Sequence, residues 1–267
     1  MVYAFGRMYN LSTVGKMKWW RLLFDLLFPK ECAVCGRVLN YHEQHFCLEC
    51  FADMPLTYFW SVKENPAERV FWGRARVERV YSLFYYTNNW RTPVHLLKYK
   101  GNIPVGKYMG KMLGEKIASA QEAMPVDYIV PVPLHWRKKM KRGYNQSEII
   151  ARGIAEGMDS AGLLAPTGPN GNIPSQPYGN LPEVIPNLLK RGAFTATQTA
   201  KDRLERWHNV SSAFRFNPKC RTLPTPGSHI LLVDDVLTTG ATLEACASIL
   251  VEQLGCRVSI ATLAYVE

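Results

Sequence analysis

The stretch that decides the fold is ILLVDDVLTTGATL, residues 230–243. An aliphatic run ends in two adjacent aspartates, Asp234 and Asp235, and threonines and a glycine follow. Such a run indicates a buried parallel strand, and ligands of open α/β sheets bind beyond the carboxyl ends of these strands. The stretch therefore predicts a ligand site at the end of a central strand.

The residue types in this stretch indicate which ligand it holds. Adjacent strand residues point to opposite faces, so a ligand with vicinal hydroxyls can donate to both carboxylates without the carboxylates meeting. Backbone N–H groups at the start of the following helix form an anion cradle, threonine hydroxyls add donors, and Gly240 lets the backbone approach the anion. A sugar diol beside a phosphate describes ribose 5-phosphate. The alternative is structural: the aspartates merely end a strand and a threonine caps a helix.

Apolar runs and helical patterns alternate through residues 74–267, which predicts an α/β domain with a mainly parallel sheet flanked by helices. Strands are expected at 76–86, 127–134, 230–235 and 256–266, and helices near 105–119, 147–158 and 241–254. Residues 1–30 form an N-terminal extension, with an amphipathic helix at 19–28 that Pro29 ends. The Pro/Gly-rich insertion 159–187 is either mobile or an ordered flap, and its composition favours mobility.

Four cysteines mark a second, small module within residues 31–60. Cys32 and Cys35 form one pair, Cys47 and Cys50 the other, each with two residues between its members. Four thiolates so spaced predict a closed, structural Zn²⁺ site. Disulfides are the alternative, and either of two histidines between the pairs, His42 or His45, offers a substitute ligand.

The net charge of +10 and the pI of about 9.3 favour anionic partners. Most of the basic surplus lies in residues 61–160, and five of the six residues 137–142 are basic. This run suits a pyrophosphate or a nucleic-acid backbone, with Trp136 and Tyr144 beside it as stacking or packing residues, but a solvated charged loop explains it too. No signal peptide and no transmembrane segment is expected, which favours a cytoplasmic location.

With these motifs in place, the chain resembles a known family. Residues 230–243 resemble the PRPP-binding signature of the type I phosphoribosyltransferases. The four cysteines, LLKYKG (96–101), residues 130–151 and residues 203–216 resemble the ComF-like competence proteins. The resemblance covers most of residues 17–267, although the insertion and the first 16 residues look additional.

The resemblance implies a type I phosphoribosyltransferase-like fold and a role for each matching residue. Asp234 and Asp235 would be the catalytic carboxylates that hold the ribose hydroxyls of PRPP. The remaining PRPP-binding residues that it implies are Thr238, Thr239, Gly240, Ala241 and Thr242 for the 5-phosphate, Arg142, Gly143, Asn145 and Gln146 for the pyrophosphate, and Thr197 and Gln198 in a flap segment. Mg²⁺ would accompany PRPP.

The resemblance also implies an activity and a setting. Phosphoribosyl transfer from PRPP to an acceptor that the sequence does not identify would be linked to DNA uptake. The alternative is a non-catalytic accessory protein that binds single-stranded DNA through the zinc module and the basic loop. Other DNA-uptake proteins would then be its partners.

Overall fold

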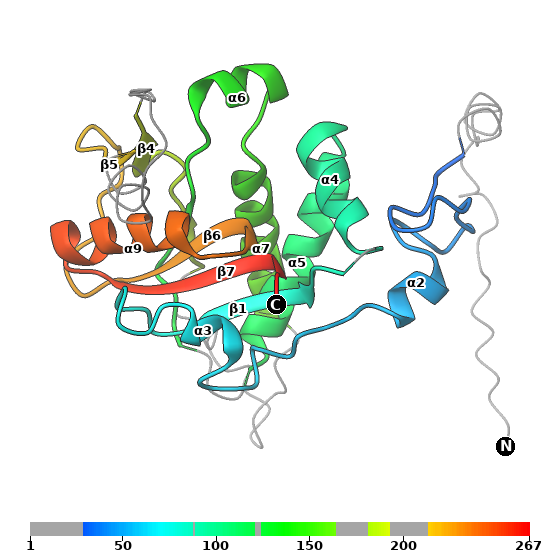
Figure 1. The fold of residues 1–267 in the computed structure, drawn as a ribbon, viewed down its shortest axis with the longest axis horizontal. Coiled ribbons are helices and arrows are strands. Elements are labelled where there is room, and N and C mark those ends of the chain that lie inside the picture. Colours follow the sequence, from blue (N-terminus) through cyan, green and yellow to red (C-terminus); the bar gives the residue numbers. More distant parts are fainter. Residues whose placement is uncertain (1–28, 88, 121–123, 164–180, 193–212) are drawn as a thin grey trace, which may run out of the picture.

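The computed structural model describes residues 29–87, 89–120, 124–163, 181–192 and 213–267. Figure 1 shows the arrangement of the elements. The helices are α2 (Leu48–Ala52), α3 (Pro66–Arg69), α4 (Arg91–Tyr99), α5 (Ile103–Ala118), α6 (Trp136–Arg142), α7 (Gln146–Leu163) and α9 (Ala241–Leu254). The strands are β1 (Val80–Tyr85), β2 (Tyr128–Pro131), β3 (Glu183–Val184), β4 (Leu189–Arg191), β5 (Phe214–Phe216), β6 (His229–Leu237) and β7 (Arg257–Tyr265).

Five parallel strands form the main sheet, in the order β1-β7-β6-β2-β3. Strand β6 lies at its centre, where Val233 is in register with Ala261 of β7 and with Pro131 of β2. The central strands are buried almost without interruption, as expected when helices cover both faces. Because all strands run the same way, their carboxyl ends meet at one edge, and Asp234 and Asp235 lie there.

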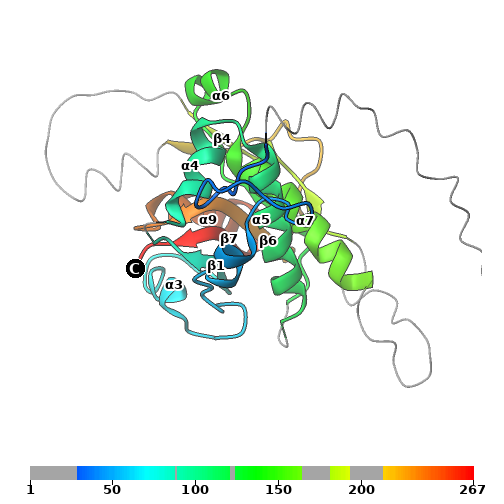
Figure 2. The same cartoon turned by 90° about the vertical axis from the view of Figure 1, so that its right-hand side faces the viewer.

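Helices cover the sheet on both sides (Figure 2). Helices α5 and α7 pack on one face, and α9 and α3 on the other. Glycines let α5 and α7 approach closely: a Cβ added at Gly110 would lie 2.5 Å from the carbonyl oxygen of Ile150, and one at Gly114 would lie 2.2 Å from that of Ile154. The tight packing holds the first turn of α7 rigidly beside the end of β6.

Several predicted elements have different bounds in the structure. Helix α9 begins and ends as predicted, whereas β1 begins later, β2 ends earlier and α7 is longer than expected. Helix α4 was not predicted. The basic run 137–142 was predicted as a loop and is part of helix α6, because the His135 side chain accepts from the backbone N–H of Arg137 at the first turn and Gly143 ends the helix at φ +85°.

Residues near both ends of the predicted insertion 159–187 belong to regular secondary structure. Its first residues continue α7, and Glu183–Val184 forms β3, which pairs in parallel with β2. The prediction was wrong here because two strand residues are too few to show an alternating pattern. Residues 164–180 and the predicted helix 19–28 lie outside the described residues.

The cysteine module packs against the sheet domain. The ring of Phe46 lies 5.2 Å from that of Trp90, beside α4, and 5.9 Å from that of Tyr108 in α5. The following segment covers the outer edge of β1, where the backbone N–H of Tyr85 donates to the carbonyl of Pro55 at 2.8 Å. Within the described part of the chain, no helix is both long and apolar enough to cross a bilayer.

Candidate functional site

The two carboxylates at the end of β6 contact different helices. Asp234 Oδ1 accepts from the Ser147 hydroxyl in the first turn of α7 and from the backbone N–H of Asp235, each at 2.9 Å. Asp235 is 5% exposed, and its Oδ1 lies 2.9 Å from Nζ of Lys98 in the last turn of α4. The adjacent charges are thus separated, as the alternation of a strand predicts.

The two aspartates differ in their environments. Burial, and then the charge of Asp235, raise the pKa of Asp234 to about 7, although the hydrogen bonds from Asp235 N–H and Ser147 oppose the shift. Asp235 Oδ2 is buried and has no hydrogen-bond partner among the described residues. A buried acceptor without a donor is costly, and a hydroxyl brought by a ligand would satisfy it. This unpaired oxygen fits the predicted role in binding a sugar diol.

The loop after β6 has the shape expected of an anion cradle. Thr238 and Thr239 are exposed, and α9 begins directly after Gly240, so the first backbone N–H groups of the helix have no intrahelical acceptor. Gly240 has φ +74°, and an added Cβ would lie 2.9 Å from Val70 Cγ1 and 3.1 Å from the Phe71 ring. Position 240 therefore requires glycine for two reasons: its backbone has a positive φ, and Val70 and Phe71, which follow α3, leave no room for a Cβ. The approach of an anion would be a third reason.

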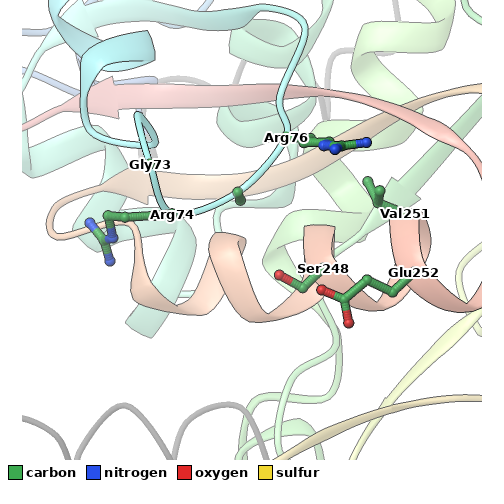
Figure 3. Close-up of a pocket in the computed structure, with 7 residues that line it drawn as sticks. Gly73, Arg74, Arg76, Ser248, Val251 and Glu252 are labelled. Carbon is green, nitrogen blue, oxygen red and sulfur yellow. The ribbon is translucent and has the colours of Figure 1, made fainter.

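A second hollow lies behind this loop (Figure 3). Arg74 and Arg76, from the segment before β1, face Ser248 and Glu252 of α9 across it. Arg74 donates to the carbonyl of Thr239 at 2.9 Å and pairs with the carboxylate of Glu244. Arg74 thus supports the loop, and it does not line the cleft that contains the two aspartates.

Basic side chains surround the two carboxylates. The cleft is lined by Val132, Pro133, Leu134, Gln146, Ser147, Asp234, Asp235, Thr242, Tyr99 and the four cations Lys98, Lys138, Arg142 and Arg191. Arg142 lies over the Tyr99 ring at 5.5 Å and donates to the side chain of Gln146. Four cations around two anions suit a ligand with several negative charges, such as a pyrophosphate.

The structure brings together most of the described residues that were predicted to bind PRPP. Asp234, Asp235, Thr242, Arg142 and Gln146 line one cleft. Thr238, Thr239, Gly240 and Ala241 form the adjoining loop, and Gly143 ends α6. Thr197 and Gln198 lie outside the described residues.

Asn145 has a different setting from the one expected. It is buried, its Nδ2 donates to the carbonyl of Val132 at 3.0 Å, and its Oδ1 accepts from the backbone N–H of Ser147 at 3.2 Å. Both ends of the amide are therefore engaged by the backbone. In this structure Asn145 fixes the start of α7 to the end of β2, and so places Ser147 beside Asp234.

Besides the apolar segment 132–134, sequence reasoning gave no role to four residues of the cleft: Lys98, Tyr99, Ser147 and Arg191. Lys98 and Tyr99 lie in LLKYKG, which was recognised as a motif but given no role. Arg191 ends β4, with its guanidinium 5.1 Å from the Phe214 ring of β5, and its Nε has no partner among the residues that the structure describes. Only the fold brings these residues to Asp234 and Asp235.

The four cysteines form a cluster that fits zinc. Their Sγ atoms all lie within 4.8 Å of one another, and those of Cys35 and Cys47 are 3.8 Å apart. Sulfurs about 2.3 Å from a tetrahedral zinc ion lie roughly 3.8 Å from each other. Burial raises the pKa of the Cys32 thiol, but backbone hydrogen bonds outweigh this and lower it to about 7, whereas burial and the neighbouring thiols raise the pKa of the Cys50 thiol. The donor set supports a structural site.

The two histidines between the cysteine pairs are not part of this cluster. His45 packs against Tyr108, with ring centroids 5.1 Å apart, and burial lowers its pKa. Within the described part of the chain, the four predicted cysteines form one cluster, and neither histidine considered as a substitute ligand belongs to it.

Comparison with known proteins identifies two domains and several relatives. The phosphoribosyl transferase domain matches residues 196–267, and the double zinc ribbon domain matches residues 23–59. DNA utilization protein YhgH of Salmonella typhimurium is 27% identical over 222 residues, covering 82% of this chain and 83% of the relative. Competence protein F of Haemophilus influenzae is 24% identical over 226 residues, covering 84% and 79%. The predicted resemblance and the predicted fold class are confirmed.

A solved structure of adenine phosphoribosyltransferase from Saccharomyces cerevisiae also matches. It is 16% identical, covers 64% of this chain and 72% of its own, and has a TM-score of 0.30.

Proposed function

We propose that this chain, a homologue of Competence protein F that combines a phosphoribosyl transferase domain with a double zinc ribbon, binds PRPP with Mg²⁺ and transfers its phosphoribosyl group. The observation that carries the proposal is the single cleft in which Asp234 and Asp235 meet Lys138 and Arg142, beside the loop that begins α9. Carboxylate acceptors for a diol and cations for a pyrophosphate lie in this cleft, beside a helix start that can hold a phosphate, and this combination supports the proposal.

Each part of the cleft has one task in this reaction. The carboxylates of Asp234 and Asp235 accept hydrogen bonds from the ribose hydroxyls and orient the anomeric carbon. The N–H groups at the start of α9 hold the 5-phosphate. As the bond from the anomeric carbon to pyrophosphate breaks, negative charge grows on the leaving group, and the cations of Lys138 and Arg142 stabilise it. Bound Mg²⁺ would neutralise pyrophosphate charge.

A calorimetric titration of PRPP into the purified protein, with and without Mg²⁺, tests this proposal. We expect magnesium-dependent binding that is lost in Asp234→Asn/Asp235→Asn and weakened in Asp235→Asn. Asp53→Asn, an exposed carboxylate of the zinc module, is the matched control and should bind as the wild type does. Release of pyrophosphate in an acceptor screen then distinguishes transfer from binding alone. Equal affinity in the double variant would contradict the site.

A role in DNA uptake is proposed from the relatives, two of which are named for DNA utilization and for competence.

A second candidate function, binding of single-stranded DNA without catalysis, is favoured by α6, which projects from the domain at the top of Figure 1. Its Trp136 is 52% exposed and lies 5.3 Å from the guanidinium of Arg137. An exposed indole beside cations suits base stacking and phosphate contact.

The DNA proposal is tested by fluorescence titration of a single-stranded oligonucleotide at several salt concentrations. The variant Lys139→Gln/Lys141→Gln changes α6 at two positions that do not line the cleft. We expect weaker DNA binding and a slope of log affinity against log salt that is smaller by roughly 1.4, at about 0.7 per phosphate contact. PRPP binding should be unchanged. An unaltered salt slope would exclude α6 as the DNA contact.

The proposed setting is the cytoplasm, because four zinc-binding thiolates persist where thiols stay reduced. The zinc module is the proposed contact for other DNA-uptake proteins. Its Tyr41 and Leu48 are 96% and 74% exposed and would be accessible to such a partner.

A further inference from the structure

Lys98 occupies the position at which the proposed ribose diol would meet Asp235. Its ammonium lies 2.9 Å from Asp235 Oδ1, and the side chains of Lys98 and Asp235 are only 24% and 7% exposed. Screening by water is therefore weak at the carboxylate, and this ion pair is stronger than an exposed surface pair. Ribose hydroxyls that bind both oxygens of Asp235, the unpaired Oδ2 and also Oδ1, compete with Lys98 for Oδ1.

The end of α4 is fixed in place, so the position of Lys98 belongs to the fold of the cleft. The Tyr144 hydroxyl, from the loop between α6 and α7, donates to the carbonyl of Leu97. The next turn reverses at Gly101, with φ +72°, and Asn102 caps α5 by accepting from the backbone N–H of Val105. The end of α4 is thus tied to the loop before α7 and to the start of α5, while the ammonium of Lys98 lies at the end of a long side chain.

The charges in the cleft differ between the empty state and the state with PRPP bound. Without ligand, Asp235 lies buried beside Asp234, Lys98 contacts Asp235, and the Lys98 charge also opposes the rise in the pKa of Asp234. When ribose hydroxyls bind Asp235, they replace the hydrogen bonds that the ammonium donates. A pyrophosphate group in the same cleft carries more negative charge than one carboxylate, and so it attracts the released ammonium more strongly.

We propose that Lys98 is a positioning residue that exchanges partners: it holds Asp235 in the empty cleft and turns to the pyrophosphate group when the ribose hydroxyls of PRPP bind Asp235. The inference rests on the proposed function and deepens it. Because of this exchange of partners, Lys98 would favour the binding of PRPP over that of ribose 5-phosphate. Ribose 5-phosphate displaces the ammonium from Asp235 and offers it no pyrophosphate in return, whereas PRPP offers one.

Calorimetry with three ligands tests the exchange in Lys98→Met: PRPP with Mg²⁺, ribose 5-phosphate, and pyrophosphate with Mg²⁺. We expect the affinity for PRPP and for pyrophosphate to fall about tenfold or more, as for the loss of one charge-assisted hydrogen bond. The affinity for ribose 5-phosphate should stay the same or rise, because Asp235 no longer holds a competing cation. Lys98→Arg should restore most of the pyrophosphate affinity.

Lys100→Met is the matched control, since it removes an exposed cation of the same LLKYKG segment that does not line the cleft. All three affinities should be those of the wild type. An equal loss for PRPP and ribose 5-phosphate in Lys98→Met would show a merely structural role, and unchanged affinities for all three ligands would exclude the exchange. If the wild-type protein binds none of the three, the proposed function itself fails, and the inference with it.

Discussion

At the scale of single residues, the cleft depends on two aspartates in unequal surroundings. Asp234 accepts from Ser147 and from the backbone, while Asp235 pairs with Lys98 and keeps one buried oxygen without a described partner. Burial raises the pKa of Asp234 to about 7, so its charge changes near neutral pH. The unfolded chain leaves the same carboxyl at its ordinary pKa, and this difference makes stability depend on pH.

We expect Asp234→Asn to flatten the fall of stability between about pH 4 and pH 7. In this window the folded protein keeps the Asp234 proton that the unfolded chain has lost, so a rise in pH favours unfolding, and the effect levels off above the folded pKa. Asp234→Asn should remove a fall in the free energy of unfolding on the order of 2 kcal/mol across this window. Partial exposure of Asp234 to water keeps the value below that expected for a fully buried carboxyl. Urea unfolding at several pH values measures it.

Asp53→Asn is the control for this titration, because it removes an exposed carboxylate far from the cleft. Its curve of unfolding free energy against pH should run parallel to that of the wild type. A parallel curve for Asp234→Asn as well would mean that Asp234 is ionised in the folded protein throughout this range.

At the scale of elements, the turn between β6 and α9 connects the two aspartates of β6 to the proposed phosphate site at the start of α9. Gly240 adopts φ +74°, ends the strand segment and begins the helix, with the Phe71 ring next to it. Arg74 holds the same turn through the carbonyl of Thr239. The short helix α3 and the segment after it therefore support the anion cradle from behind, although neither lines the cleft.

We expect Gly240→Ala to destabilise the protein by about 2–3 kcal/mol and to weaken the binding of ribose 5-phosphate. The new methyl group would face both backbone strain and the contacts of 2.9 Å with Val70 and 3.1 Å with Phe71. Gly143→Ala separates the two causes, because Gly143 has φ +85° with nothing within 4 Å of an added Cβ. It should cost about 1 kcal/mol.

Urea unfolding and calorimetry with ribose 5-phosphate give the two quantities for both glycine variants. Gly143→Ala should leave ribose 5-phosphate binding unchanged, because it lies at the end of α6 and away from the loop that begins α9. Equal losses of stability in the two variants would show that packing against Phe71 adds nothing to the strain at Gly240.

At the scale of the whole molecule, the zinc module and the sheet domain share one core. Cys32, Phe46 and Cys47 are buried in the same cluster as Phe84 and Trp90. The segment after the module also bonds to the free edge of β1, through Pro55 and Thr57. Bound zinc would therefore stabilise more than the loops of the four cysteines, because these cysteines are continuous with the packing of α4 and α5.

We expect Cys35→Ser to lose the zinc, about one ion per chain, and to lower the melting temperature of the whole protein by several degrees. Metal analysis and calorimetric melting measure the two effects. Cys220→Ser is the control, because Cys220 is a half-buried thiol outside the cluster and should leave both values unchanged. Undiminished zinc in Cys35→Ser would rule out the four-thiolate site.

The sequence alone determined those features that a local pattern encodes. The run 230–243 is one strand, one turn and the start of one helix, so its residues are adjacent in space because they are adjacent in the chain. The bounds of α9 were predicted correctly for this reason, since Gly240 and Gly255 punctuate the helix at both ends. The cysteine spacing predicted its cluster in the same way, because each pair is held within one short turn.

Only the tertiary structure decided which distant side chains complete the cleft. Ser147 contacts Asp234 across 87 positions of the sequence, and Lys98 and Arg191 come from still other elements. Asn145, which the resemblance placed among the PRPP-binding residues, also joins β2 to α7 through both ends of its amide, a role that the sequence did not indicate. The reason is physical: the order β1-β7-β6-β2-β3 sets which carboxyl ends are neighbours, and that order follows from long-range packing that no local pattern contains.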